Sequence, residues 1–335
     1  MSSKKEKKAP KVSIGGQALI EGVMMNGPKG AAIAVRNSDG EIITEMQSNS
    51  FKVDKIKFFK LPFVRGIVNF IKSMMIGYKS LMRSAELSGQ LDEEEEIENM
   101  SRLDRWLNSH MGPKMIAVVT GIASVLAVVL GVGLFIFLPT YIVDLLDEKL
   151  LGGAISKLHP LFEGVMRMII MILYMLGISK MKDIKRVFMY HGAEHKSIFC
   201  FEKGLELTVE NIRGCKRFHP RCVTSFLFVI LIISIIVSSV AVIIFPILNA
   251  SEYRLLWMVI KIFVIIPVVT SISYEFIKYA GRHDNIFTKI LSAPGLWMQR
   301  ITTAEPDDSM IEVAIASIKA VIDGNTQNGD KNDLQ

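Results

Sequence analysis

Two histidines and a glutamate lie within five residues of one another in the run His191-Gly-Ala-Glu194-His195. Residues three and four positions apart share one face of an α-helix, so a helix would point both imidazoles and the carboxylate in one direction. Imidazoles bind zinc, and a carboxylate beside the metal can take a proton from zinc-bound water. The spacing H-x-x-E-H is that of the reversed zinc-protease motif. The run therefore predicts a metal centre in which His191 and His195 are ligands and Glu194 is the catalytic base.

The sequence around this run predicts a helix that buries it. Between residues 181 and 201, apolar residues recur at helical spacing, and the three polar residues of the motif continue the same stripe. Buried polar groups need partners, and a metal ion satisfies imidazole nitrogens. A structural helix in which the histidines hydrogen-bond to the backbone or to Glu194 remains the alternative. Gly192 weakens the helix prediction, because glycine in a helix interior costs about 1 kcal/mol relative to alanine.

Two histidines do not complete a zinc site, which uses four protein ligands when structural and three plus water when catalytic. His219 and Cys222 lie in the same segment between apolar runs, and His283 follows the last apolar run. We expect the remaining ligands among these three. Other polar residues that the chain could bring to the site are Gln17, Glu21, Glu275, Arg282 and Asp284. Arg221 or Arg282 could neutralise a developing oxyanion, and the sequence leaves open whether Gln17 and Glu21 reach the site.

The elements that must position these residues include helices long enough to cross a membrane. Half of the 335 residues are hydrophobic. They gather in four runs, at 115–138, 161–178, 223–245 and 255–274. The first and third runs are uncharged and long enough to span about 30 Å of hydrocarbon at 1.5 Å per residue. Glu163 and Arg167 interrupt the second run, and Lys261 and Pro267 interrupt the fourth. The composition predicts a mainly α membrane protein with about four transmembrane helices, and a buried or re-entrant helix is the alternative for the two interrupted runs.

The distribution of basic residues predicts the orientation. Ten Lys and Arg residues lie between positions 179 and 222, but only Lys149 and Lys157 lie between positions 141 and 160. The positive-inside rule therefore places the histidine motif and both termini in the cytoplasm of a multi-pass plasma-membrane protein. The net charge of +6 fits attraction to anionic lipid, and no aromatic residues interleave with the bases as they would for nucleic acid. We expect the lipid bilayer, and membrane or cytoplasmic proteins, as partners. The oligomeric state stays open.

The positions of the cysteines bear on their chemistry. All three, Cys200, Cys215 and Cys222, fall within this predicted cytoplasmic segment. Disulfides are rare in that compartment, so we expect thiols or metal ligands.

A small β-rich cytoplasmic unit is expected before the membrane region, over residues 12–60. Residues 31–36 and 41–47 flank the turn signal Asp39-Gly40 and predict a β-hairpin. Residues 14–28 read as one strand with glycine-permitted turns at both ends, and residues 51–60 as another. A basic tail at 1–11 is expected to be disordered.

The remaining segments are expected to lie at the membrane surface or in the cytoplasm. Residues 62–87 carry an apolar face and several bases, which predicts an amphipathic interfacial helix, with a core-facing helix as the alternative. An acidic linker at 92–98 completes the region 61–110, and the membrane region spans 111–280. Residues 281–322 form a C-terminal segment in which Pro294–Arg300 reads as a turn, followed by a final helix that Glu305-Pro-Asp-Asp308 opens. The tail at 323–335 is expected to be disordered.

Several separate motifs resemble one family. They are Gly15-Gly-Gln-Ala-Leu-Ile-Glu21, Tyr190-His-Gly-Ala-Glu-His-Lys196, His219-Pro-Arg-Cys222, Ala280-Gly-Arg-His-Asp284 and Pro294-Gly-Leu-Trp-Met-Gln-Arg300. Together they resemble the YqhQ-type family of bacterial integral membrane proteins, domain of unknown function family 1385, over about residues 12–320. The resemblance implies a membrane fold and a predicted metal-dependent enzyme. It supplies neither substrate nor ligands.

The leading hypothesis is a zinc-dependent hydrolase, with a peptidase as its most specific form, that acts at the cytoplasmic face of the membrane. The alternative is a non-enzymatic membrane scaffold or partner-binding protein in which the histidine cluster is structural. A cation transporter is disfavoured, because Lys261 is the only central charge in the predicted spans.

Overall fold

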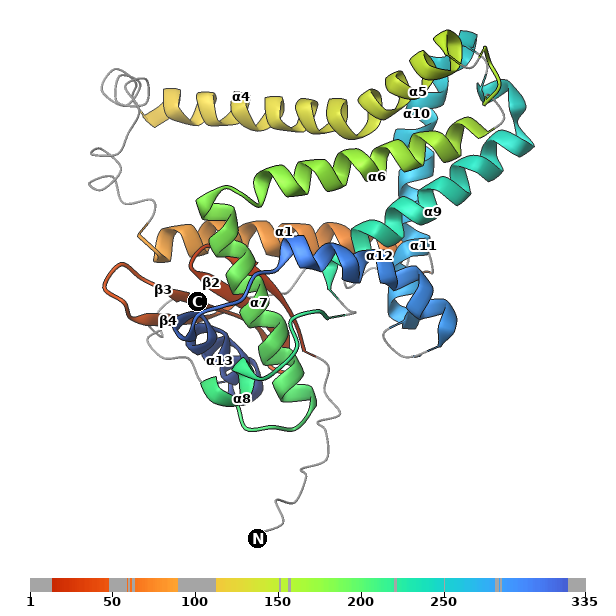
Figure 1. The fold of residues 1–335 in the computed structure, drawn as a ribbon. Coiled ribbons are helices and arrows are strands. Elements are labelled where there is room, and N and C mark those ends of the chain that lie inside the picture. Colours follow the sequence, from red (N-terminus) through yellow and green to blue (C-terminus); the bar gives the residue numbers. More distant parts are fainter. Residues whose placement is uncertain are drawn as a thin grey trace. The chain divides into compact units, whose positions relative to one another are not determined.

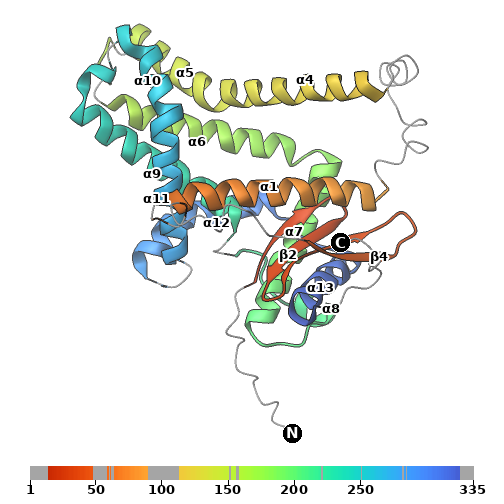
Figure 2. The ribbon, with the colours of Figure 1, turned by 180° about the vertical axis from the view of Figure 1, so that it is seen from behind.

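The computed structural model describes residues 14–47, 59, 61, 64–89, 113–150, 152–155, 158–219, 222–249, 251–280, 283 and 285–324. The chain forms two compact units (Figures 1 and 2), which are described separately. We call them the sheet unit (1–91, 175–229 and 270–335) and the membrane unit (92–174 and 230–269). Several predicted segments lie outside the described residues: the tail 1–11, all of 51–60 except Phe59, the acidic run 92–98, Arg221, Arg282, Asp284 and residues 325–335.

The sheet unit contains an antiparallel four-stranded sheet in the order β1-β2-β3-β4. The strands are β1 (Gly15–Leu19), β2 (Gly22–Gly27), β3 (Gly30–Arg36) and β4 (Ile42–Gln47). The predicted hairpin around Asp39-Gly40 is confirmed by the pairing of β3 with β4. The prediction of one strand over 14–28 was wrong, because the chain turns at Ile20-Glu21. Glu21 has φ +48°, a left-handed conformation that its residue type does not signal.

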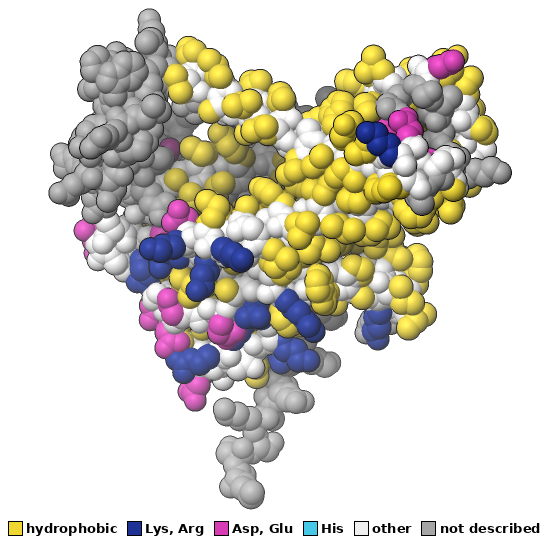
Figure 3. Space-filling view, turned by 45° about the horizontal axis from the view of Figure 1, so that its top comes forward, with side chains coloured by type: hydrophobic (Ala, Val, Ile, Leu, Met, Phe, Trp, Pro, Cys, Tyr) yellow, Lys and Arg dark blue, Asp and Glu magenta, His cyan; other side chains and the backbone are white. Residues whose placement is uncertain are grey.

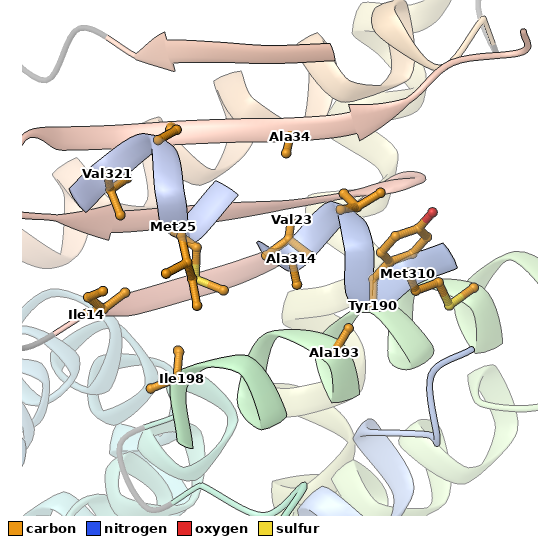
Figure 4. Packing of buried hydrophobic residues seen from close by; sticks show 14 residues of the cluster. Ile14, Val23, Met25, Ala34, Tyr190, Ala193, Ile198, Met310, Ala314 and Val321 are labelled. Carbon is orange, nitrogen blue, oxygen red and sulfur yellow. The ribbon is translucent and has the colours of Figure 1, made fainter. Parts of the chain in front are cut away.

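Helices cover both faces of this sheet. On one face, Leu19, Met24 and Ile33 pack with Ile76 and Leu81 of α1 (Val64–Leu87). On the other face lie α7 (Lys182–Glu202) and α13 (Asp308–Asp323). Figure 4 shows the shared core, to which the sheet, α7 and α13 all contribute: Val23, Met25, Ala34, Tyr190, Ala193, Ile198, Ala314 and Val321. The strands over 12–60 therefore do not form a core alone, but share it with helices far away in the sequence.

Two further helices also belong to the sheet unit. The short α8 (Val209–Arg213) packs through Ile212 with Cys200 of α7 and Ile311 of α13. In α12 (Ile286–Thr302), a capping box between Asn285 and Thr288 begins the helix. The prediction of a turn at Pro294–Arg300 was wrong, since Pro294 lies inside α12. Proline has no backbone N–H, so one hydrogen bond within the helix is missing at Pro294, but the helix continues beyond it.

The membrane unit is built from long apolar helices. Its elements include α4 (Pro113–Val132), the π-helical η3 (Gly133–Phe137), α5 (Leu138–Lys149) and most of α6 (His159–Ile178). The second stretch of this unit contains the part of α9 (Val223–Ile244) from residue 230 onward, the 3₁₀ turns η5 (Pro246–Asn249) and η6 (Ser251–Tyr253), α10 (Arg254–Ile260) and the π-helical η7 (Lys261–Ile265). It ends in α11 (Ile266–Ala280), whose residues from 270 onward belong to the sheet unit. Four stretches are long and apolar enough to cross a membrane: Gly121–Lys149, His159–Ile178, Leu227–Ile244 and Leu255–Ala280. They confirm the four predicted runs, and apolar side chains dominate their surface in Figure 3.

The charges that interrupt two of these runs meet inside the membrane unit. Lys261 Nζ lies 2.5 Å from Glu163 Oε2, and Arg167 donates to Glu163 Oε1 at 2.6 Å. Glu163 and Lys261 are both buried. Each cation is therefore paired with the carboxylate, as is usual for ionisable residues within membrane segments.

Candidate metal centre

Helix α7 brings His191, Glu194 and His195 together on its buried side. Their residues are only 9 %, 4 % and 1 % exposed, and the two imidazole centroids lie 4.4 Å apart. Cys222, immediately before α9, joins them: one ligand atom from each of His191, His195 and Cys222 lies within 4.8 Å of the others. His191 Nε2 lies 3.1 Å from Cys222 Sγ. Two imidazoles and a thiol thus converge at the spacing of metal ligands.

Hydrogen bonds at Nδ1 show that this nitrogen carries a hydrogen in both imidazoles. His191 Nδ1 lies 2.8 Å from the carbonyl oxygen of Thr302, and His195 Nδ1 lies 2.6 Å from that of Arg217. A carbonyl oxygen can only accept, so each Nδ1 carries the hydrogen and donates it. In the neutral form of each ring, the Nε2 lone pair is then available to bind a metal. Metal-binding histidines commonly donate their other N–H to such an acceptor.

His195 shows an unmet bonding requirement. Its Nε2 is buried and makes no hydrogen bond of ordinary geometry within the described part of the chain, although the thiol of Cys222 is close enough to affect its pKa. Burial lowers the pKa of His195, so the ring is neutral near pH 7. A buried acceptor without a partner is costly, and a metal ion would satisfy it.

Glu194 is a buried carboxyl group beside this cluster. Burial raises the pKa of Glu194 to about 7, partly opposed by the charge of His191. Its Oε2 lies 3.9 Å from His191 Nε2, which is too long for a hydrogen bond. A carboxyl group whose pKa lies near the working pH suits general acid–base catalysis.

Gly192 has a specific packing role that explains its place in the helix. A Cβ at this position would lie 2.0 Å from the carbonyl oxygen of Ala304. The chain after α12 crosses α7 here, and Ala304 N–H donates to the carbonyl of Phe188 at 2.8 Å. Gly192, which weakens the helix prediction, therefore allows this close crossing. The crossing lies two residues after Thr302, whose carbonyl oxygen accepts the hydrogen bond from His191.

We expect Gly192→Ala to destabilise the protein by at least about 2 kcal/mol, because the methyl group must displace backbone in a packed interior. The thermal unfolding midpoint of the full-length protein in detergent measures this. Gly177→Ala in α6 is the matched control: its Cβ would meet no atom within 4 Å, and its midpoint should stay the same or rise. Equal midpoints for the two variants would contradict the packing role.

His219 lies beside the centre but outside the group of three. Its ring centroid is 5.7 Å from that of His195, and its Nε2 lies 3.5 Å from Glu202 Oε2. Gln299, a residue that the sequence interpretation missed, fixes its backbone. The His219 N–H donates to Gln299 Oε1, and Gln299 Nε2 donates to the His219 carbonyl, both at 2.7 Å. The only sequence signal was a polar residue in the run Pro294–Arg300, and Gln299 is fully buried.

A cavity of about 320 Å³ opens beside these residues. Ser73 and Ile76 of α1 form one wall. Strand β1 and the candidate centre supply much of the rest: Gly15, Gly16, Gln17, Glu194, His195, His219 and Cys222. Gln17 therefore lies at the site, where Gly77 of α1 makes room for its amide.

The remaining predicted site residues have other partners. Glu21 pairs with Arg186 at 2.5 Å, and Glu275 with Arg65 at 2.5 Å. His283 is exposed and stacks on Tyr279 with 4.2 Å between ring centroids. Among the described residues, the structure does not place these three in the group formed by His191, His195 and Cys222.

The chain matches a family model described as "Protein of unknown function (DUF1385)" over residues 61–324, which include the whole candidate centre. The chain belongs to this family. It is also 33 % identical over 314 residues to a protein named "Uncharacterized protein YqhQ" from Bacillus subtilis (strain 168), a match that covers 92 % of each chain. No solved structure matches. These names give no reaction, so the function must be argued from the geometry.

Proposed function

We propose that the protein is a zinc-dependent hydrolase in which His191, His195 and Cys222 hold the metal. The observation that supports this best is that one ligand atom from each of these three residues lies within 4.8 Å of the others. Two neutral imidazoles and one thiolate form a donor set that zinc prefers. Both Nδ1–H groups already have acceptors, which leaves the Nε2 atoms for the metal.

The same residues indicate a hydrolytic reaction. Zinc with three protein ligands keeps a fourth position for water and lowers the pKa of that water to about 7. Glu194 is the base that accepts the proton, because its buried carboxylate lies beside His191 and is not in the group of converging ligand atoms. The adjacent cavity has room for a substrate carbonyl group beside this carboxylate.

A non-enzymatic scaffold is the competing function, and one observation favours it. The 3.1 Å contact between His191 Nε2 and Cys222 Sγ can exist as a hydrogen bond without any metal. In that case the cluster is only a structural link between α7 and the start of α9, and the protein acts by binding partners.

The proposed location is the plasma membrane, with the centre and both termini on the cytoplasmic side. The four apolar stretches support insertion into lipid. The ten basic residues between positions 179 and 222 support the orientation. Helix α1 adds an exposed apolar stripe that suits the lipid interface: Ile71, Met74, Met75, Tyr78 and Met82.

Elemental analysis of the full-length protein in detergent tests the metal directly. We expect about one zinc per chain in the wild type and a loss of at least tenfold in Cys222→Ala, because only two ligands remain. Cys200→Ala is the matched control: this thiol is also buried, but it contacts the carbonyl of Glu206 and should not change the zinc content. Zinc-free wild type, or equal zinc in Cys222→Ala and wild type, would favour the scaffold.

A further inference from the structure

We infer that the substrate is a polypeptide in extended conformation, which pairs with the outer edge of β1 and so passes the candidate centre. This inference rests on the proposed hydrolase function and names its substrate class. Strand β1 is an edge strand of the sheet, and its residues Gly15, Gly16 and Gln17 line the same cavity as Glu194 and His195.

The hydrogen-bonding pattern of the sheet shows which backbone groups of β1 face away from β2. Arg36 N–H donates to the carbonyl of Glu21, so Glu21 faces β3. Backbone groups alternate in direction along a strand, so Gly22, Met24 and Asn26 face β1, where they pair with Leu19, Gln17 and Gly15. The N–H and C=O groups of Gly16 and Ala18 then point away from the sheet. The next outward group, Ile20 N–H, donates to Ser84 Oγ of α1, which confirms the direction.

Within the described part of the chain, no strand pairs with the outer edge of β1 next to the centre. Gly15 is exposed, and Gly16 and Ala18 are half-buried. Among the described residues, no hydrogen bond joins the outward groups of Gly16 or Ala18 to another element. Such an edge is a template for another strand, and extended peptides bind in this way through main-chain hydrogen bonds.

Glu194, the base in the proposed hydrolase, lies beside β1. A Cβ on Gly16 would lie 2.8 Å from Glu194 Cγ, so the carboxylate side chain packs directly against β1. A strand added beside Gly16 runs about 4.8 Å from β1 and carries a carbonyl group every residue. Water adds its oxygen to the carbonyl carbon of a peptide bond, the C–N bond breaks, and Glu194 transfers the proton from water to the departing nitrogen. The products are a carboxylic acid and an amine.

Peptide binding to the full-length protein in detergent tests the inference. The Glu194→Gln background suppresses cleavage during the measurement, and the probe is a fluorescein-labelled random decapeptide library. A second library with N-methylated amides cannot donate main-chain hydrogen bonds, and we expect it to bind at least tenfold more weakly. Ala18→Pro removes one outward N–H without removing a bond to β2, and should weaken binding of the unmodified library at least tenfold while zinc content stays the same.

Met46→Pro is the matched control, because Met46 faces outward on β4, the opposite edge of the sheet. It should leave peptide binding unchanged. Equal binding of the two libraries, or equal binding by Ala18→Pro and its parent, would overturn the β1 inference and leave the metal centre intact. Wild-type protein without zinc would instead contradict the proposed hydrolase. Binding does not require turnover, so the library comparison still tests the β1 edge in that case.

Discussion

Glu194→Gln should lower hydrolysis by a factor of about 10² to 10⁴ and leave zinc binding intact. Glutamine has nearly the same shape as glutamate, so the packing against Gly16 is kept, but its amide cannot accept the proton from water. Glu194 is not in the group of converging ligand atoms, so the metal should stay. Cleavage of a quenched fluorescent peptide library and elemental analysis of the same sample measure both quantities.

Glu210→Gln is the control for this variant, because Glu210 is an exposed acid of α8 and does not line the cavity. Its activity should equal that of the wild type. If Glu194→Gln were as active as the wild type, the carboxylate would not be the base. If it lost zinc as well as activity, Glu194 would belong to the ligand set.

Glu163→Gln should destabilise the membrane unit by about 3–5 kcal/mol, the largest stability effect that we expect in this protein. The carboxylate of Glu163 contacts both Lys261 and Arg167, so its loss leaves two cations without their anion. The thermal unfolding midpoint in a detergent of fixed concentration measures the change. An additional Lys261→Met should recover part of it, because the double variant buries one unpaired cation fewer.

The ion pair between Arg36 and Glu312 gives the matched control. Its atoms lie 2.9 Å apart, but the Glu312 side chain is 53 % exposed, so Glu312→Gln should cost well under 1 kcal/mol. Equal midpoints for Glu163→Gln and Glu312→Gln would show that water or lipid headgroups solvate the cluster in the membrane unit.

The sequence predicted what depends on short-range periodicity. The four apolar runs, the helix around His191 and the hairpin at Asp39-Gly40 all follow from spacing along the chain, and the structure contains each of them. The turn at Ile20-Glu21 could not be predicted in this way. Its left-handed residue is a glutamate, and the contacts of Glu21 with Arg186 and Tyr190 lie far away in the sequence.

Tertiary packing decided which of the predicted ligands converge. Sequence spacing offered His219, Cys222 and His283 as equals, and only Cys222 joins His191 and His195 among the described residues. The carbonyl groups of Thr302 and Arg217, which orient the two imidazoles, have no residue-type signal, because every residue has a carbonyl group. Every residue except proline also has a backbone N–H and C=O that can face either way, so only the register of the sheet shows which groups of β1 face outward.

The sheet unit is assembled from three stretches of chain that are separated by the apolar helices. Its core is closed by α13, which packs Ala314 and Val321 against β-strand residues made at the start of the chain. During translation, the strands and α7 leave the ribosome long before this last helix does. The imidazole of His191 obtains its acceptor only when Thr302 has been synthesised. The candidate centre is therefore complete only after all four apolar stretches have been translated.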